Sequence, residues 1–384
     1  MHFQHSQALS FGLELELQIV NPETGRLTPL AAHVYQALQT GEQAHCFAME
    51  ATLSTIEVNS SVHHDARSMQ QEVLALVAQA RAAAQLLGGD LRGGGTQMTQ
   101  FWNERITSPG QRALDLESRF GFLPKRFSTY GMHVHVGMPH PEAAIRVANA
   151  MQALCPLFIA LAAASPFLQR ADTGFAAARP LESLVYPNGG PMPWLRDWPH
   201  LEQVARDLFS TGMAHTLKDI YWDVRPKPEF GTVEVRVFDT PLSVHKAVAL
   251  AAFTRSVAAL VLNHHLELPD RAQSETTNQR VSRFLACRDG MQAQLFNPFE
   301  FSWVGATGWF GQLMGDVERL TPFPDDSSHL QALRDVMKQG GDYAVMRSTW
   351  AGLAPTGNNP QDLERALSDY CAVMCGKLLE PMRV

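Results

Sequence analysis

The stretch that decides the fold is "FGLELELQIV", residues 11 to 20, in which leucine alternates with glutamate and then with glutamine. A two-residue alternation is typical of a β-strand, because successive side chains point to opposite faces of a sheet. Leu13, Leu15 and Leu17 then share one face. Glu14 and Glu16 share the other, roughly 6.6 Å apart along the strand. The two glutamates could face water, or they could bind a divalent metal ion. This stretch alone favours the interpretation that they face water.

Two further segments show the same alternation. "YGMHVHVGMP", residues 130 to 139, places His133 and His135 on one strand face, and "GTVEVRVFD", residues 231 to 239, places Glu234 and Arg236 on one face. Each strand by itself has a simple surface explanation. Together they carry the residue types that hold metal, phosphate and carboxylate. If the three strands are neighbours, their polar faces line a single concave surface.

A fourth segment, "MEATLSTIEVNSS", contributes Glu50 and Glu57. The simpler interpretation is a pair of exposed carboxylates that flank a turn. Combined with Glu14, Glu16 and Glu234, the pair would instead complete an oxygen-rich site suited to Mg²⁺ or Mn²⁺. Zinc is less favoured, because the chain has no HExxH motif and no Cys/His cluster.

Arginines accompany these carboxylates. "WDVRPKP", residues 222 to 228, places Arg225 just before the Glu234 strand, and Arg179 and Arg236 are further candidates. Any one arginine is more often a surface ion-pair partner than a phosphate ligand. Beside a metal cluster, however, planar guanidinium groups suit the transfer of a phosphoryl group. Other chemistries lack their motifs, because the sequence has no GxxxxGK[ST], no GxGxxG and no GxSxG.

Composition limits the classes of protein that remain. The chain has 384 residues, of which 45% are hydrophobic and 18% charged, as in a compact enzyme-sized protein. A formal charge of -7 argues against a nucleic-acid partner. The five cysteines include no CxxC pair and the N-terminus lacks the pattern of a signal peptide, so we expect a cytoplasmic protein. Residues 147–168 carry no charge, but Asn149, Gln152 and Pro156 interrupt them, which predicts a buried helix and no membrane partner.

Periodicity and turn residues predict the order of elements. Strands are expected at 9–20, 91–97, 130–139 and 231–239, and helices at 66–87, 141–164, 244–264, 274–288, 309–319, 328–339 and 361–378. Residues 172–199 are expected to form a loop, and a loop of this length is usually functional or disordered. The strands cluster in the first 240 residues without regular strand–helix alternation. We therefore predict one α+β unit, with a mainly antiparallel sheet covered by helices and a helical C-terminal portion.

The motifs, taken in order, resemble one family of enzymes. "FGLELEL", the Glu50/Glu57 segment, "GGGTQ", "HVHVG", "ASPF" with "ADTGFAAARP", "GGPMPW", "WDVRPKPEFGTVEVRVFDTPLS" and "RFLACRDG" follow one another as in the carboxylate-amine ligases related to glutamate-cysteine ligase type 2. The resemblance covers residues 10 to about 290. It implies a curved, mainly antiparallel sheet like that of glutamine synthetase and the guanidino kinases, with helices on its outer face and ATP and Mg²⁺ on its concave face. It further implies a single ligase catalytic domain over residues 1–384, in which 291–384 form the helical C-terminal portion.

The resemblance also implies roles for individual residues. The metal ligands would be Glu14, Glu16, Glu50, Glu57 and Glu234. ATP would be bound by His133, His135, Arg179, Arg225 and Arg236, of which Arg236, Arg225 and His135 would be catalytic. In relatives the position of Glu50 is often Asp, and Ser282 and Asp289 stand where many relatives have Asn and an aromatic residue.

The implied activity is ATP-dependent C–N ligation. A substrate carboxylate would be phosphorylated to an acyl phosphate, from which an amine displaces phosphate to form an amide. Glutamate and cysteine are the default substrates, another small amine can replace cysteine, the activity is often weak in such members, and relatives suggest a homodimer. Two alternatives stay open at this point. They are a guanidino kinase-like phosphotransferase and a non-catalytic descendant that binds nucleotide or metal.

Overall fold

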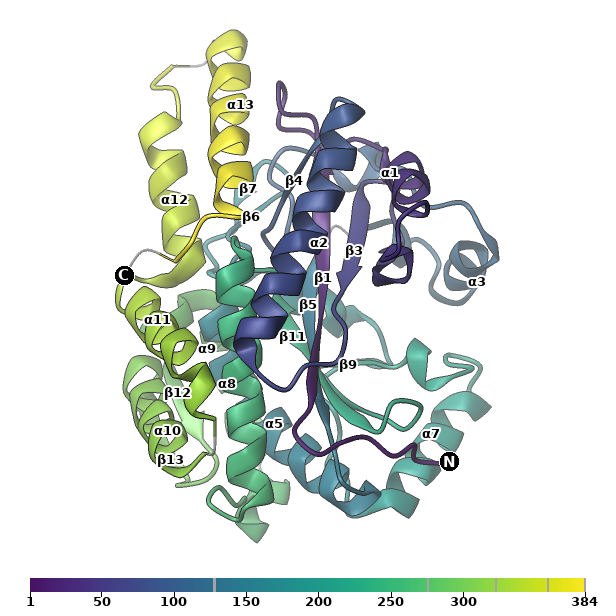
Figure 1. Ribbon diagram of the computed structural model, residues 1–384, viewed down its shortest axis with the longest axis vertical. Coiled ribbons are helices and arrows are strands. Elements are labelled where there is room, and N and C mark those ends of the chain that lie inside the picture. The colour runs from purple at the N-terminus through teal and green to yellow at the C-terminus, as the bar shows by residue number, and fades with distance from the viewer. Residues whose placement is uncertain (127–128, 275, 322, 358, 383–384) are drawn as a thin grey trace.

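A seven-stranded antiparallel sheet forms the centre of the molecule (Figure 1). The computed structural model describes residues 1–384 except 127–128, 275, 322, 358 and 383–384. The strand order is β10-β11-β5-β1-β3-β2, and β4 pairs with the far part of β1. The strands are β1 (Phe11–Val20), β2 (Phe47–Met49), β3 (Thr55–Asn59), β4 (Asp90–Arg92), β5 (Gly131–Gly137), β10 (Val224–Lys227) and β11 (Thr232–Asp239).

The predicted alternation places β1 at the heart of this sheet. Leu13, Leu15 and Leu17 are at most 2% exposed and belong to the main hydrophobic core. β5 pairs with one edge of β1 and β3 with the other, in registers that put His133 and Asn59 opposite Glu14. β11 in turn pairs with β5. The three alternating strands are therefore direct neighbours, as a shared polar surface requires.

Three long helices cover the apolar face of the sheet. They are α2 (Ala66–Leu86), α5 (Pro141–Ala162) and α8 (Val244–Leu262) (Figure 1). α8 contacts both α2 and α5, and all three contact the strands. By length and composition α5 and α8 could each span a membrane, but 89% and 94% of their most apolar windows are buried inside the molecule. The prediction of a buried helix in the uncharged stretch is thus confirmed.

The other helices lie around this two-layer centre. In the first part of the chain they are α1 (Ala31–Leu38), α3 (Gln111–Phe120), α4 (Leu123–Arg126), α6 (Arg179–Glu182) and α7 (Trp198–Ser210). Toward the C-terminus they are α9 (Thr277–Asp289), α10 (Ala306–Leu320), α11 (Ser327–Lys338), α12 (Gly341–Leu353) and α13 (Pro360–Lys377). The helices predicted after residue 273 are all present. α1, α3, α4, α6, α7 and α12 were not predicted, and α6 lies within residues 172–199, which were expected to form a loop.

One part of the C-terminal prediction is wrong. β12 (Gln294–Asn297) and β13 (Ser302–Gly305) form an antiparallel hairpin where only helical structure was expected. Phe296 stacks edge-on against Trp303 across the hairpin, and aromatic cross-strand pairs of this kind favour strands over helix. Short two-stranded pieces are also formed by β6 (Phe167–Leu168) with β7 (Ala171–Asp172), and by β8 (Gly189–Gly190) with β9 (Tyr221–Trp222).

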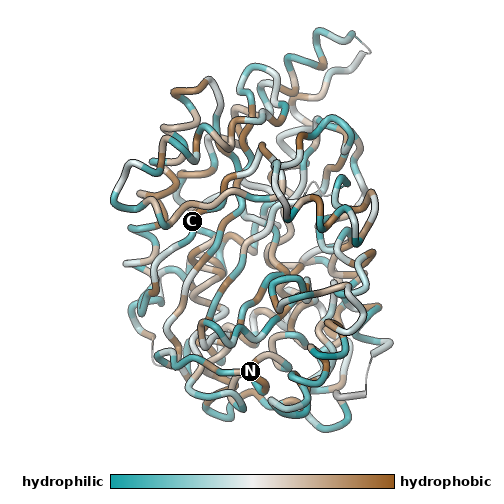
Figure 2. The backbone as a smooth tube through the Cα atoms, turned by 90° about the vertical axis from the view of Figure 1, so that its right-hand side faces the viewer, coloured by the Kyte–Doolittle hydropathy of each residue, from teal (hydrophilic) through white to brown (hydrophobic). Residues whose placement is uncertain are grey.

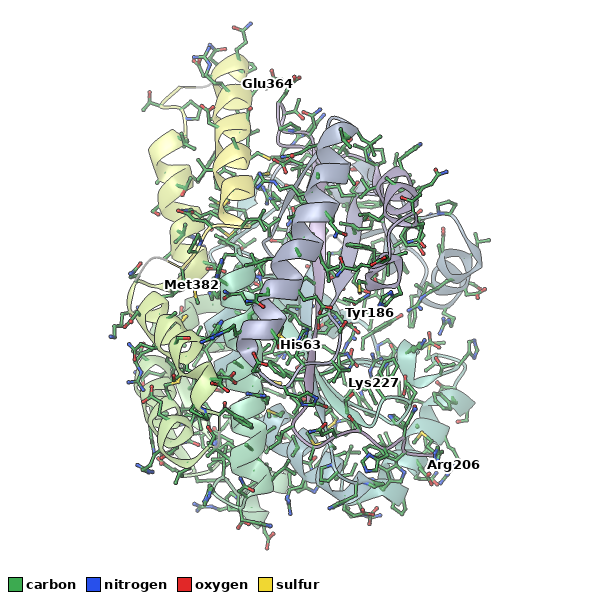
Figure 3. The ribbon with its side chains drawn as sticks, viewed as in Figure 1. His63, Tyr186, Arg206, Lys227, Glu364 and Met382 are labelled. Carbon is green, nitrogen blue, oxygen red and sulfur yellow. The ribbon has the colours of Figure 1, made fainter. Side chains whose placement is uncertain are left out.

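The polar face of the sheet is turned away from α2, α5 and α8. In Figure 3, Tyr186 and Lys227 lie to the right of β1, whereas α8 lies to its left. The turned view in Figure 2 shows that the loops at the lower end of the molecule are mainly hydrophilic, as expected for connections at the surface. The polar face is therefore the part of the sheet that is free to carry chemistry.

Candidate active site

The predicted site residues converge on the polar face of β1, β3, β5 and β11. Cross-strand neighbours on one face lie close together, and the register places Glu14 opposite His133, Glu16 opposite Glu57 and Glu234 opposite His135. His133, His135 and Glu234 are buried, and Glu14, Glu16 and Glu57 are only partly exposed. The surface-strand explanation, favoured from the first stretch alone, is therefore wrong for β1.

One cluster, here called the histidine group, consists of Glu14, His135 and Glu234. Each offers a ligand atom, and these atoms lie within 4.8 Å of one another. His135 Nε2 donates to Glu14 at 3.1 Å, and His135 Nδ1 contacts the Thr232 hydroxyl at 3.1 Å. His133 Nδ1 donates to the other oxygen of Glu14 at 2.7 Å. Glu14 thus bridges both predicted histidines.

A second cluster, the carboxylate group, consists of Glu16, Glu50 and Glu57. Its ligand oxygens also lie within 4.8 Å of one another. The backbone N–H of Gly131 donates to Glu16 at 2.5 Å, and Asn59 Nδ2 donates to Glu57 at 3.0 Å. Three carboxylates this close repel one another when all are ionised. The five predicted glutamate ligands are therefore divided between two adjacent groups.

The charge states of the two groups differ. Burial alone would raise the pKa of Glu14, but hydrogen bonds from His133 and His135 outweigh it and hold that pKa well below its usual range. Burial would also raise the pKa of Glu234, but the positive charges of Arg236 and Arg225 outweigh it and lower that pKa. The histidine group therefore keeps its carboxylates ionised. Burial, reinforced by Arg236, lowers the pKa of His133 to about 4, so its ring is neutral at pH 7.

The carboxylate group is shifted in the opposite direction. Burial raises the pKa of Glu16 to about 7. Burial and the neighbouring charge of Glu16 raise the pKa of Glu50 to about 7, and burial with the charge of Glu50 raises that of Glu57 to about 8. Without a cation, these carboxyls hold protons near neutral pH. Three oxygen donors in one place are the ligand set that a hard divalent cation such as Mg²⁺ takes, so the donors present fit that ion.

The predicted arginines take different positions. Arg236 donates to Glu234 and is partly exposed on the open face. Arg225 is buried and fully engaged, because Nε and Nη2 bind Glu234 at 2.9 and 2.8 Å and Nη1 binds the carbonyls of Leu217 and Ile220. In this arrangement Arg225 holds Glu234 in place, while Arg236 is the guanidinium nearer to solvent.

Arg179 lies over Gly131 and donates to the carbonyls of Arg236 and Val237 at 3.3 and 3.2 Å. A Cβ added at Gly131 would fall 2.0 Å from Arg179 Nη2. The glycine therefore makes room for this guanidinium, whose charge acts on Glu16. All three arginines are at the site. Arg179 and Arg225 donate most of their hydrogen bonds to other groups of the protein.

Asn59 is a site residue that the sequence analysis did not single out. It follows Glu57 by two positions on β3 and therefore continues the same polar face. The alternation in "TIEVN" was the signal that could have found it.

A large cavity lies elsewhere in the molecule. It has a volume of about 910 Å³ and is lined by α5, α9 and the segment around Met192 and Trp194. Its described lining residues include no carboxylate and no histidine, which are the metal ligands that the candidate active site concentrates. We therefore place the chemistry on the polar face of the sheet and not in this cavity.

Solved structures with the same arrangement of helices and strands define the class of fold. A glutamate--cysteine ligase from Francisella tularensis in complex with AMP matches with a TM-score of 0.71 and 12% identity over 97% of this chain and 90% of its own. A bifunctional glutathione synthetase from Pasteurella multocida matches with a TM-score of 0.68 and 13% identity, over 95% of this chain and 52% of its own. The protein thus has a ligase fold, and the predicted α+β class with helices on the outer face of an antiparallel sheet is confirmed.

The family follows from the sequence comparisons. The family model described as glutamate-cysteine ligase family 2 matches residues 10–349. A protein named "Putative glutamate--cysteine ligase 2" from Cupriavidus metallidurans is 34% identical over 334 residues, which is 87% of this chain and 88% of that protein. A protein of the same name from Paracidovorax citrulli is 38% identical over 300 residues, or 77% of this chain and 79% of its own length. The chain belongs to glutamate-cysteine ligase family 2 and is an enzyme of the ligase class.

Proposed function

We propose that this protein is an ATP-dependent carboxylate-amine ligase that forms an amide through an acyl phosphate. The observation that carries this proposal is the pair of acidic groups on one face of the sheet, with Arg236 beside them. Phosphoryl transfer needs positioning and charge neutralisation more than covalent chemistry, and this face concentrates both. Membership of the family supports the reaction type.

The two groups would hold divalent cations in different ways. Glu16, Glu50 and Glu57 offer oxygen only, which suits Mg²⁺, while the histidine group with His135 also suits Mn²⁺. When bound, such cations neutralise the polyphosphate of ATP and orient its terminal phosphoryl group.

The protein's own residues then have distinct tasks. Arg236 stabilises negative charge on the transferring phosphoryl group. Arg225 fixes Glu234 through Nε and Nη2, while its Nη1 binds two nearby carbonyls. Neutral His133 orients Glu14. In the reaction, a carboxylate oxygen attacks the γ-phosphorus and ADP leaves. The amine nitrogen next attacks the acyl carbon, the bond to phosphate breaks, and the nitrogen loses a proton.

The substrates that the family name supports are glutamate and cysteine, joined as γ-glutamylcysteine. By resemblance we expect this activity to be weak, so the test includes other amines. Purified protein is incubated with ATP, Mg²⁺ and glutamate, with and without cysteine or each of a panel of amines. ADP and phosphate are measured by colorimetry and chromatography, and new amides by mass spectrometry.

The ligase proposal requires ADP, phosphate and an amide in equal amounts, and turnover only when both partners are present. ADP formation with a stable phosphorylated acceptor and no amide would instead indicate a phosphotransferase. Binding of Mg²⁺ and ATP without any turnover would indicate a binding protein. Either result would refute the ligase mechanism.

A further inference from the structure

Two histidines outside the candidate active site donate to the same side chain. His245 Nδ1 donates to Gln70 Oε1 at 3.0 Å, and His329 Nε2 donates to the same oxygen at 3.1 Å. Gln70 lies on α2, His245 on α8 and His329 on α11. All three residues are partly exposed, so dissolved ions can reach them. Polar atoms from three helices therefore meet on the helical side of the sheet, away from its polar face.

No sequence motif marks this group. His245 and His329 are 175 and 259 positions away from Gln70 in the chain, so no short spacing of the HExxH kind could reveal it. The packing of α8 against α2 and α11 brings the three side chains together. The absence of zinc motifs from the sequence is therefore no guide to this part of the molecule.

The distances within the group are close to those of a metal site. Ligand atoms at about 2.1 Å from a tetrahedral zinc ion lie roughly 3.4 Å from one another. The two nitrogen–oxygen distances here are 3.0 and 3.1 Å, only slightly shorter than that separation. Both ring nitrogens point toward the amide oxygen, as a hydrogen bond requires. An ion at this place is thus within reach of both rings, and rotation of the flexible Gln70 side chain keeps its oxygen in contact.

The protonation state of the two rings also suits a cation. Burial lowers the pKa of both His245 and His329, and the charge of His329 lowers that of His245 further. Both rings are therefore neutral at pH 7, which is the form that binds metal. On binding, each ring moves its proton to its other nitrogen, so no proton has to be released.

The surrounding charges are balanced in favour of a cation. The negative charges of Asp326 and Asp65 act on His329, and the positive charge of Arg67 opposes them. Asp65 is the N-cap of α2 and Asp326 is the N-cap of α11. Their carboxylates offset the positive ends of these two helices, which would otherwise repel a metal ion.

We propose that Gln70, His245 and His329 bind a Zn²⁺ ion that holds the start of α11 against α2 and α8. Two imidazole nitrogens and one amide oxygen supply three ligands, and water completes the tetrahedron. Imidazole suits zinc, whereas Mg²⁺ prefers oxygen ligands, so this site and the carboxylate group select different ions. Because the ligands come from three helices, binding stabilises their packing. This inference does not depend on the proposed ligase function.

The first test is the zinc content of the protein. Equilibrium dialysis against Zn²⁺, with Mg²⁺ and a non-hydrolysable ATP analogue present, is followed by elemental analysis. The wild-type protein is expected to retain one more zinc ion per chain than His245→Ala or His329→Ala. His33→Ala is the control, because His33 is exposed on α1, and it should retain as much zinc as the wild type. Zinc held by the acidic groups is common to all four proteins and cancels in the comparison.

Gln70→Glu tests the third ligand in the opposite direction. This change puts a carboxylate oxygen in place of the amide oxygen and adds a negative charge, so zinc affinity is expected to rise roughly tenfold or more. Differential scanning fluorimetry should show the same order. The Tm gain with Zn²⁺ should be larger in Gln70→Glu than in the wild type, and smaller in His329→Ala.

Two results would overturn the proposal. Equal zinc contents in the wild type and both folded histidine variants would leave the acidic groups to account for all bound zinc. If a histidine variant fails to fold, Gln70→Glu decides, because a zinc affinity equal to that of the wild type would show that Gln70 faces no metal ion.

Discussion

Among the described residues, Glu14 is the one side chain that accepts hydrogen bonds from both site histidines, His133 and His135. Its two oxygens accept from His133 and His135, and it also offers a ligand atom to the histidine group. Replacing it with glutamine preserves size and one acceptor but removes the charge. We predict that Glu14→Gln lowers kcat roughly 100-fold or more while the free energy of unfolding changes by less than about 1 kcal/mol. Rates at several Mg²⁺ concentrations and urea denaturation would measure both.

Glu234→Gln serves as the informative comparison for Glu14→Gln. Glu234 is 1% exposed and pairs with two arginines, so its replacement should reduce stability as well as activity. If both variants turned over at the wild-type rate with unchanged Mg²⁺ dependence, the assignment of the histidine group would be refuted.

The raised pKa values of Glu16, Glu50 and Glu57 predict a pH-dependent response to Mg²⁺. These carboxyls bind protons up to pKa values of about 7 to 8 in the folded protein, against 4.5 in the unfolded chain. The free energy of unfolding of the metal-free protein should therefore fall as pH rises from about 4.5 to 8, since unfolding releases those protons. Mg²⁺ needs the deprotonated form, so the Tm gain on adding Mg²⁺ should be larger at pH 8 than at pH 6.

Differential scanning fluorimetry with and without Mg²⁺ at both pH values checks this expectation. Glu57→Gln should reduce the difference between the two pH values, because it removes one of the titrating carboxyls. A Tm gain that is equal at pH 6 and pH 8 in the wild-type protein would contradict it.

At the scale of elements, β5 must approach Arg179 closely at its first residue. Because a Cβ at Gly131 would fall 2.0 Å from Arg179 Nη2, Gly131→Ala should displace that guanidinium and lower kcat roughly tenfold or more. Circular dichroism should show that the fold is retained. Gly308→Ala is the control, because Gly308 lies in α10 with no heavy atom within 4 Å of the added Cβ, and its activity should equal that of the wild type.

The strand order, more than any single strand, creates the two acidic groups. β1 stands between β5 and β3, so its glutamates meet histidines on one side and glutamates on the other. An antiparallel register fixes which side chains are opposite one another, and a shift of one residue would turn every carboxylate into the core. The packing of Leu13, Leu15 and Leu17 against the helices therefore also determines the site.

At the scale of the whole molecule, a buried ion pair joins the helical layer to the C-terminal helices. Arg255 of α8 binds Asp326, which precedes α11, and Asp326 also accepts from the N–H of Ala66 at the start of α2. Removing one partner would leave a charge buried and unpaired. We predict that Asp326→Ala lowers the free energy of unfolding by about 3–5 kcal/mol without altering Mg²⁺ dependence.

Chemical denaturation measures this effect, with Asp316→Ala as the control. Asp316 pairs with Arg319 on the surface of α10, and its loss should cost no more than about 0.5 kcal/mol. Equal stabilities of the two variants would show that the Arg255–Asp326 pair does not hold the layers together.

Much of the fold could be predicted from the sequence, because the local periodicity of apolar residues indicates most of the strands and long helices. The strands around Leu15, Val134 and Val235 and the long apolar helices have clear alternation or helical patterns, and the structure confirms them. The hairpin at 294–305 was missed because its strands have four residues each, too few to establish a period. α12 was missed because Gly340 and Gly341 indicated a break, whereas Gly340 adopts a left-handed conformation and caps the helix that follows.

The sequence by itself determined which residues share a strand face, because side chains alternate with a fixed period along any strand. It therefore identified Glu14, Glu16, Glu234, the two histidines and Arg236 as candidates, and the short segment that holds Glu50 and Glu57 added those two. Only the tertiary structure decided that Glu14 joins His135 and Glu234 and that Glu16 joins Glu50 and Glu57. Those groupings depend on strand order and register between segments far apart in the chain, and no local pattern encodes such pairings.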